Sequence, residues 1–221
     1  MRSVSIHIGV CRVATSIVES MSDDLISLLL DRSKRVFTQK EFASSFRNVI
    51  NAPRSDMLAL RDESKSFRQG MRQVNRFDNV VVSQHALFGT APELFVYKQL
   101  LPRINKRAAN LADIFADRKM RIHLAIASQK DCLMSVMSDD DSFDFEEDFE
   151  IPSWADVVTN IRRGCPHAEI TVWDFDQPET MYVPFLAALL DISPEYIDGL
   201  TEAHLDTACC QELKHAKTLN Q

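Results

Sequence analysis

The residues Ile6-His7-Ile8-Gly9-Val10-Cys11-Arg12-Val13-Ala14-Thr15-Ser16 join an apolar run to a turn, which is followed by two hydroxyl side chains. The stretch from Ser3 to Ile8 alternates and is rich in Val and Ile, which predicts a β-strand. Apolar residues at helical spacing from Thr15 to Leu30 predict a helix after the turn. Such a turn is typical of an α/β domain, and the N–H groups at a helix N-terminus can bind an anion.

The rest of the chain continues this alternation of strands and helices. Further strands are predicted at Asn79–Ser83, Arg121–Ile126 and Glu169–Phe175, and helices at Phe37–Ile50, Leu94–Asp117, Trp154–Arg163 and Met181–Leu190. The segment Leu94–Asp117 is either one long helix or two helices broken near Pro102. The polar stretch from Arg54 to Arg76 is either a surface helix or an irregular excursion. Strands that alternate with long helices predict a three-layer α/β/α fold with a mainly parallel sheet.

Length and composition set bounds on the class of protein. A chain of 221 residues with 45% hydrophobic and 26% charged residues is expected to form a single domain over residues 1–221, with an acidic connector at 138–150 and a polar tail at 194–221. The formal net charge of −7 argues against nucleic-acid and anionic-membrane partners. No apolar run approaches the roughly 18 residues of a membrane span. His7 and Arg12 interrupt the only stretch that resembles a signal peptide, so we expect a cytoplasmic location.

The five cysteines show no pattern of a metal site. Their number is odd, and no C-x-x-C pair or His/Cys cluster has metal-ligand spacing: they are Cys11, Cys132, Cys165, Cys209 and Cys210. Reduced thiols are therefore expected, and no metal is expected.

In a parallel sheet, ligands bind beyond the carboxyl ends of the strands. The segments that follow the predicted strands should therefore meet at one edge of the sheet. They are Gly9–Ser16, Ser83–Gly89, Ala127–Ser135 and Asp174–Gln177.

The opening segment also carries a family resemblance. His7 to Ser16 resembles the H-I-G-x-H-K-T-[GA]-T-[TS] start of the bacterial sulfotransferase-like P-loop proteins, whose co-substrate is 3′-phosphoadenosine 5′-phosphosulfate (PAPS). Val80 to Gly89 is similar to that family's S-x-E-x-L-x-G strand end, and Ile122 to Ser135 is similar to its h-x-h-x-h-R-x-x-x-D-x-x-x-S segment. Trp154 and Ala168 to Asp176 resemble its last strand. The likeness runs in order over roughly residues 6–192 and implies a P-loop NTPase-like sulfotransferase architecture.

The resemblance implies a set of site residues. The opening turn would hold the 5′-phosphosulfate end of PAPS, with Arg12 at the place of the family's lysine. Ser135 would contact the 3′-phosphate, and His85 would be the base that accepts the acceptor's proton. The implied catalytic residues are thus His85 and Arg12. The implied co-substrate-binding residues are Gly9, Val10, Cys11, Arg12, Val13, Ala14, Thr15, Ser16 and Ser135.

Three positions depart from the family pattern. Arg12 keeps the charge of the lysine, but its planar fork is not a point-like ammonium. His85 stands where the family has a glutamate, and either side chain can serve as a base. Ala127 stands where the arginine for the 3′-phosphate is expected, which removes a charge-assisted contact of roughly 1.5–3 kcal/mol. Lys130 lies in the same loop.

Eight of the twelve residues from Asp139 to Glu150 are acidic. Their spacing lacks the glycine of a calcium loop. A solvated connector is one interpretation of this run. A lid over the site, or a surface for a basic protein partner, is the other.

Three functions follow from these observations. The first is a sulfotransferase that moves a sulfuryl group from PAPS to a hydroxyl or amine acceptor, either a small molecule or a saccharide. The second is a sulfotransferase fold that has lost transfer chemistry and binds another anion or nucleotide. The third is an interaction scaffold that uses the acidic run.

Overall fold

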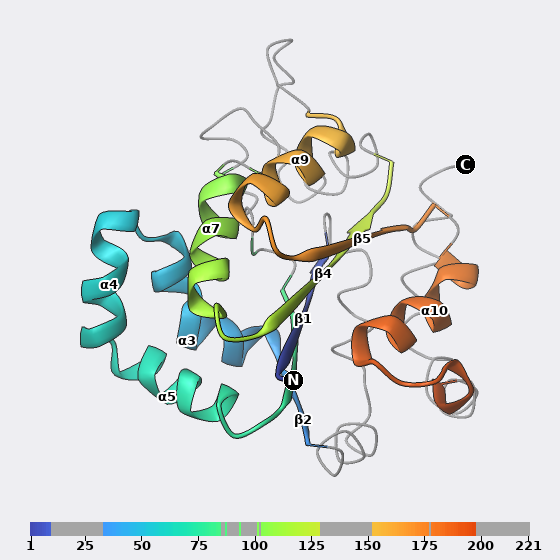
Figure 1. Ribbon diagram of the computed structural model, residues 1–221. Helices are drawn as coiled ribbons and strands as arrows, with labels where there is room; N and C mark the ends of the chain where they lie inside the picture. The colour runs from blue at the N-terminus through green and yellow to red at the C-terminus, as the bar shows by residue number, and fades with distance from the viewer. Residues whose placement is uncertain are drawn as a thin grey trace, which may run out of the picture.

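The computed structural model describes residues 1–9, 33–84, 87, 93, 101, 103–128, 152–176 and 178–197. Strands and helices alternate along these residues (Figure 1). The strands are β1 (Ser3–Gly9), β2 (Lys34–Phe37), β3 (Asn79–Ser83), β4 (Lys119–Ile126) and β5 (Glu169–Asp174). The helices are α3 (Gln39–Asn51), α4 (Arg54–Glu63), α5 (Lys65–Val74), α7 (Ile104–Ile114), α9 (Trp154–Gly164) and α10 (Pro178–Leu190).

The described strands form one sheet in the order β2-β3-β1-β4-β5, and every pair is parallel. The first strand is thus central, with β3 and β4 as its neighbours. Helices cover both faces of the sheet (Figure 1). The prediction of a three-layer α/β/α fold with a parallel sheet is confirmed.

Two hydrophobic cores lie on the two faces of the sheet. The larger one, here called the α7-side core, joins residues of the central strands to α3, α5, α7 and α9. The smaller one, here called the α10-side core, joins the sheet to α10. Consecutive residues of β3 alternate between them, because Val80 and Val82 belong to the α7-side core and Val81 to the α10-side core.

Most predicted elements that fall within the described residues are present, and the helix predicted from Thr15 to Leu30 lies outside those residues. The strand β2 was not predicted, since its sequence Lys-Arg-Val-Phe carries two charges in four residues. Its pairing with β3 and the bonds from Lys34 Nζ to the carbonyls of Leu190 and Asp191, both 2.6 Å, hold it in the sheet. The polar stretch from Arg54 to Arg76 forms two helices, α4 and α5, and α7 ends at Ile114 rather than at Asp117.

Local sequence signals account for the helix starts. The Thr38 hydroxyl accepts a hydrogen bond from the Glu41 N–H at 3.3 Å, and the Glu41 carboxylate accepts one from the Thr38 N–H at 3.0 Å. Ser153 and Asp156 form the same reciprocal pair at the start of α9. These capping boxes satisfy N–H groups that the helix leaves unpaired.

Arg118 connects the ends of several elements. Its guanidinium donates to the carbonyls of Ser3 at 3.3 Å, Asp78 at 3.2 Å, Val74 at 2.8 Å and Phe77 at 3.1 Å. These carbonyls belong to the start of β1, the end of α5 and the entry to β3. Arg118 therefore fixes the amino edge of the sheet, opposite the edge where the strands end.

A search of the described residues for membrane spans finds no helix with the length and apolar character to cross a bilayer.

Candidate functional site

The carboxyl ends of the strands meet at one edge, as the sequence predicts. Parallel register aligns Gly9 of β1 with Ala125 of β4, and Ile126 of β4 with Asp174 of β5. On the other side of β1, the Gln84 N–H donates to the His7 carbonyl at 3.0 Å and extends the ladder between β3 and β1. Side chains from four distant parts of the sequence thus share this edge.

The strand order makes β1 the point where connections diverge. The strand that follows β1 lies beyond β3, whereas the strands that follow β3 and β4 lie toward β5. Since crossovers in parallel sheets are right-handed, connections that run in opposite directions cover opposite faces. A crevice forms at such a switch point, and α/β proteins bind ligands there. Gly9, the last residue of β1, lies at this point.

Most of the predicted site residues lie outside the described residues. This holds for Val10 to Ser16, including Arg12, and for His85, Ser135 and the acidic run from Asp139 to Glu150. Gly9 is buried at the end of β1, at the place where the sequence predicts the turn to begin. The anion cradle and the base therefore remain predictions.

Two histidines lie side by side on neighbouring strands below this edge. His7 of β1 is paired in register with His123 of β4, and both are buried. His7 Nδ1 lies 2.9 Å from the Ser83 hydroxyl of the neighbouring strand β3, a contact that indicates a structural role. Trp173 Nε1 donates to His123 Nδ1 at 3.2 Å. Burial, and then the nearby positive charge of Arg121, lower the pKa of His123 to about 4, so this imidazole is neutral near neutral pH.

A cavity of about 400 Å³ opens where β4 and β5 end and α9 begins. Its lining includes Ala127, the position at which the family has its 3′-phosphate arginine. The Ala127 carbonyl accepts from Trp154 Nε1 at 3.2 Å, and the Asp176 carboxylate accepts from the Ser128 N–H at 3.0 Å. The described residues that line it are Ile126, Ala127, Ser128, Ser153, Trp154, Asp174 and Asp176.

The charges of this cavity do not suit a phosphate. Asp174 and Asp176 contribute carboxylates, and no Lys or Arg is among the described residues that line it. Two carboxylates repel a phosphate in a partly desolvated cavity, and among the described lining residues no guanidinium offsets them. The residues around Ala127 therefore do not fit the 3′-phosphate of PAPS.

Two site candidates were not predicted from the sequence. Gln84 and Arg107 are both buried, and each has one polar side-chain atom without a hydrogen-bond partner in the described structure. Arg107 also forms an ion pair with Glu93. Among many charged residues in a helical stretch, no sequence signal marks Arg107, because its burial depends on how α7 packs.

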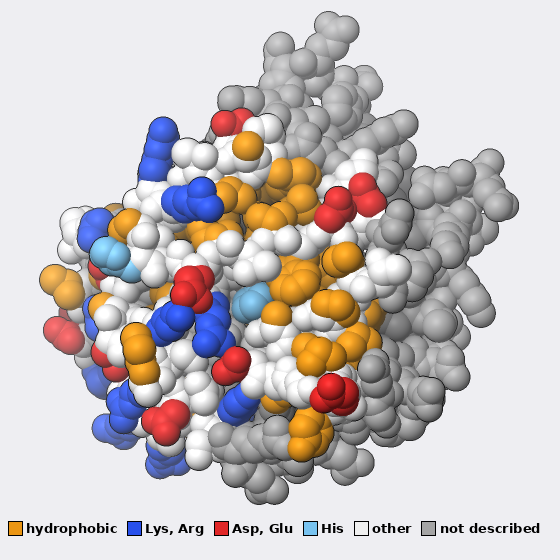
Figure 2. Space-filling view, turned by 45° about the vertical axis from the view of Figure 1, so that its right-hand side comes forward, with side chains coloured by type: hydrophobic (Ala, Val, Ile, Leu, Met, Phe, Trp, Pro, Cys, Tyr) orange, Lys and Arg blue, Asp and Glu red, His pale blue; other side chains and the backbone are white. Residues whose placement is uncertain are grey.

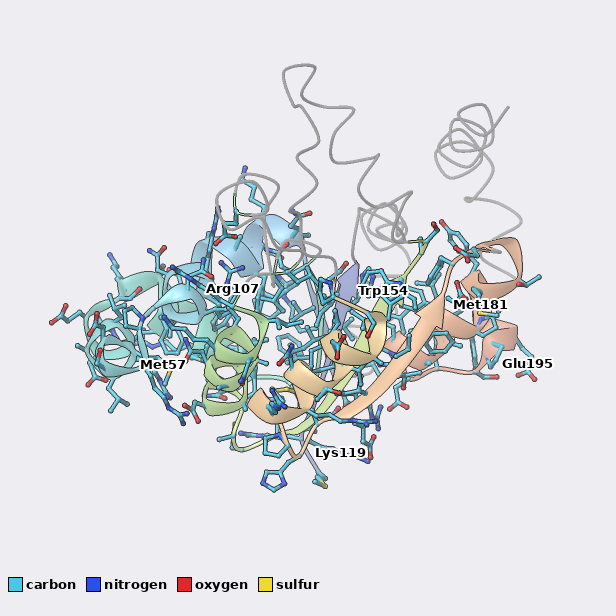
Figure 3. All side chains as sticks on the ribbon, turned by 90° about the horizontal axis from the view of Figure 1, so that it is seen from above. Met57, Arg107, Lys119, Trp154, Met181 and Glu195 are labelled. Atoms are coloured by element: carbon cyan, nitrogen blue, oxygen red, sulfur yellow. The ribbon has the colours of Figure 1, made fainter. Side chains whose placement is uncertain are left out.

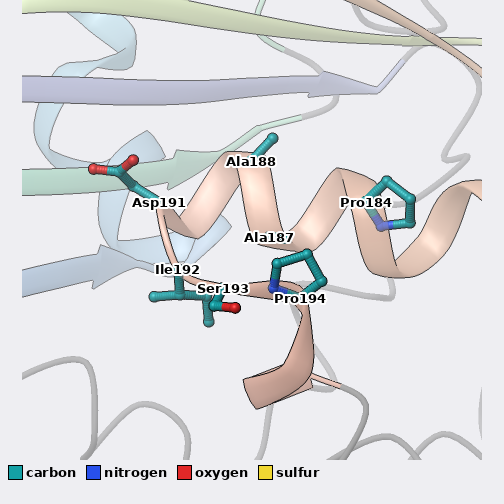
Figure 4. Close-up of a pocket in the computed structure, with 7 residues that line it drawn as sticks. All are labelled: Pro184, Ala187, Ala188, Asp191, Ile192, Ser193 and Pro194. Atoms are coloured by element: carbon teal, nitrogen blue, oxygen red, sulfur yellow. The ribbon is translucent and has the colours of Figure 1, made fainter.

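A larger cavity, of about 510 Å³, lies at the opposite edge (Figure 4). Its lining comes from the second half of α10 and the turn that follows: Pro184, Ala187, Ala188, Asp191, Ile192, Ser193 and Pro194. Because α10 follows β5, it starts at the carboxyl edge and ends near the start of β2, where Lys34 contacts Asp191. The lining of this cavity is mainly apolar, and the cavity lies far from the carboxyl ends of the strands. It is therefore not part of the candidate site.

Metal and thiol chemistry find no support in the described residues. These residues contain no group of three or more His, Cys, Asp or Glu side chains placed to hold a metal ion. Cys165 is buried, and its thiol donates to the Ala108 carbonyl at 2.7 Å. Burial raises the pKa of Cys165 to about 12, so this thiol is not a nucleophile at neutral pH.

Charges are mixed on the face that carries α10. Figure 2 shows acidic and basic side chains interspersed with apolar ones there. Lys119 and Arg121 of β4 pair with Glu169, and Arg121 also pairs with Asp191. The described part of this face therefore presents no broad field of one sign to a ligand.

Comparison with models of known families and with curated proteins finds no match to the sequence.

Proposed function

We propose that the chain is a divergent sulfotransferase-like protein that binds the phosphosulfate end of PAPS where β1 ends and transfers the sulfuryl group to a hydroxyl or amine acceptor. The observation that carries this proposal is the position of β1. It is the central strand, it ends in Gly9 at the switch point, and the segment that resembles the family's anion-binding turn starts there. A cytoplasmic location is part of the proposal.

The proposed reaction needs a base and a cation at this edge. An acceptor oxygen or nitrogen forms a bond to sulfur while the bond from sulfur to the phosphate oxygen breaks. A base takes the acceptor's proton, and a cation balances the charge that develops on the leaving phosphate. The resemblance gives these roles to His85 and Arg12, and they are tested below.

A second function is favoured by the cavity at Ala127. Its carboxylates, Asp174 and Asp176, disfavour a 3′-phosphate, which favours a protein that has lost the binding of PAPS and binds another anion or nucleotide elsewhere at the carboxyl edge. The two functions differ in whether a 3′-phosphate on the nucleotide strengthens its binding.

Calorimetric titration with adenosine 3′,5′-bisphosphate tests the first function. We expect a dissociation constant on the order of 10 μM. Arg12→Ala should weaken this binding by roughly tenfold to a hundredfold, because a charge-assisted contact is lost. Arg162→Ala, at an exposed position of α9, is the matched control and should leave it unchanged. No heat of binding at about 1 mM ligand would exclude the first function.

Adenosine 5′-phosphate separates the two functions. A PAPS-binding protein should bind the 3′,5′-bisphosphate at least roughly tenfold more tightly. Equal or tighter binding of the 5′-monophosphate would support the second function. His85→Ala then tests the base, since it should retain nucleotide binding and lose transfer.

A protein partner of the acidic run is a third possibility and has its own assay. Deletion of residues 139–150 should abolish the capture of a basic partner if that run is the contact surface. Unchanged capture would remove the scaffold function.

A further inference from the structure

Two buried polar side chains at the carboxyl edge each have an atom without a hydrogen-bond partner. Gln84 is 6% exposed and its Oε1 has no partner in the described structure. Arg107 is 3% exposed, and its Nη1 has no partner there either. An unpaired buried polar group costs about 1–3 kcal/mol, and more when it is charged. An oxyanion can accept from the donor, Arg107 Nη1, whereas the acceptor, Gln84 Oε1, leaves that amide free to turn and present its NH₂ group instead.

Both side chains belong to the same face of the sheet. Gln84 follows Val82 by two residues, and Val82 packs in the α7-side core. Because alternate residues of an extended chain share a face, Gln84 is directed toward α7. Arg107 lies on the buried stripe of α7 with Ile104 and Ala108, which belong to the same core.

Both side chains also lie near the carboxyl ends of the strands. The helix α7 connects β3 to β4, and these strands are parallel to β1. It therefore runs back across the sheet and begins at the carboxyl edge. Arg107 is in its first turn, where its N–H donates to the Arg103 carbonyl. Figure 3, seen from above, shows Arg107 beside α3 and α7.

The start of α7 favours a negative charge. Arg103, the N-cap residue of this helix, makes no side-chain cap hydrogen bond, and the helix dipole is positive at this end. Glu93 takes the Nη2 atom of Arg107 and leaves Nη1 as the donor. An oxyanion accepts a charge-assisted hydrogen bond from such a guanidinium. Gln84 contributes an amide, which can rotate to present its NH₂ group to the same oxyanion.

We propose that Arg107, Gln84 and the N-terminus of α7 bind a phosphate or sulfate group of the ligand. The inference rests on the proposed function for the identity of that ligand, an anionic nucleotide. Arg107 would supply a guanidinium for the ligand on the face of the sheet that α7 covers. At the ends of β4 and β5, by contrast, an alanine, Ala127, lines the cavity.

The variants Arg107→Lys and Gln84→Met test this subsite. Lysine keeps a charge for the pair with Glu93 but loses the second guanidinium nitrogen, so anion binding should weaken by roughly tenfold or more. Methionine keeps the volume of Gln84 and removes the unpaired oxygen. It should weaken binding by roughly threefold to tenfold and raise the melting temperature of the free protein by about 2–4 °C. Arg162→Lys is the exposed control.

Two probes are titrated at constant ionic strength: inorganic sulfate and adenosine 3′,5′-bisphosphate. Binding of both probes that is unchanged in Arg107→Lys and Gln84→Met would overturn the inference, even if Arg12→Ala abolishes nucleotide binding. Sulfate binding that depends on Arg107, without nucleotide binding, would support the subsite and reject the proposed function. No binding of either probe to the wild type would overturn both. Glu93→Gln should act in the opposite direction and tighten binding, since it removes the carboxylate beside Arg107.

Discussion

At the residue scale, the sheet places titratable side chains where water cannot reach them. His123 is the clearest case, because it is buried between Trp173 and the strands β1 and β5. Its Nδ1 accepts from the Trp173 indole, so the neutral ring carries its proton on Nε2. Protonation of Nδ1 would break this bond and bury a charge near Arg121.

The pKa of His123 predicts a loss of stability in acid. The folded value is about 4 and the unfolded value about 6.5, so between these pH values the unfolded chain binds more protons. The contribution of the neutral His123 to the free energy of unfolding is fully present above about pH 6.5. It decreases as the pH is lowered and is lost below about pH 4. The difference corresponds to at most roughly 3 kcal/mol.

Urea unfolding of the wild type and His123→Gln, at about pH 7 and about pH 4.5, measures this contribution. Glutamine can still accept from Trp173 but does not titrate. The wild type should lose more free energy of unfolding between the two pH values than the variant does. Equal losses would show that His123 does not cause the acid sensitivity.

At the element scale, the arrangement of α7 depends on close contact with α9. Gly164, at the end of α9, lies so near α7 that an added Cβ would be 2.4 Å from the Asn105 carbonyl oxygen and 2.7 Å from the Ala109 nitrogen. These are backbone atoms and cannot rotate away. Because α7 also carries Arg107, this contact helps to position the inferred subsite.

Gly164→Ala should therefore destabilise the protein, by roughly 1–3 kcal/mol, through overpacking. The sign of the change in stability is informative, because replacing glycine by alanine at an unobstructed helix position stabilises the protein by up to about 1 kcal/mol. The melting temperature should fall by several degrees, while Thr159→Ala, at an exposed position of α9, should leave it nearly unchanged. A rise in the melting temperature of Gly164→Ala would show that the two helices do not approach as closely.

At the scale of the whole molecule, one sheet separates two cores. The α7-side core and the α10-side core use opposite faces of the same strands, so neither keeps its sheet surface if the other unfolds. We therefore predict that the described residues unfold as one cooperative unit.

Phe46 and Phe185 test that expectation, because each is fully buried in a different core. Phe46→Ala and Phe185→Ala should each lower the free energy of unfolding by about 3–5 kcal/mol. Calorimetry should show one transition, and both variants should shift it as a whole. Two separate transitions, each sensitive to one variant, would contradict a single cooperative unit.

Much of the architecture could be predicted from the sequence. Runs such as Asn79–Ser83 are too apolar to be anything but buried strands, and Thr38 with Glu41 marks a helix start. The alternation of strands and helices along the chain is enough to predict a parallel sheet and the edge at which its strands end. The strand β2 was missed because its stability comes from β3 and the carbonyls at the end of α10, which lie more than a hundred residues away.

The sequence by itself determined the layers, the parallel sheet and the edge at which the strands end, because hydrophobic period and helix length are local properties. Only the tertiary structure decided which polar side chains are buried at that edge. Gln84 and Arg107 look like ordinary loop and helix residues in the sequence, and Ala127 gives no sign of its carboxylate neighbours. The environment of a side chain depends on distant segments, since burial and electrostatic interactions act through space rather than along the chain.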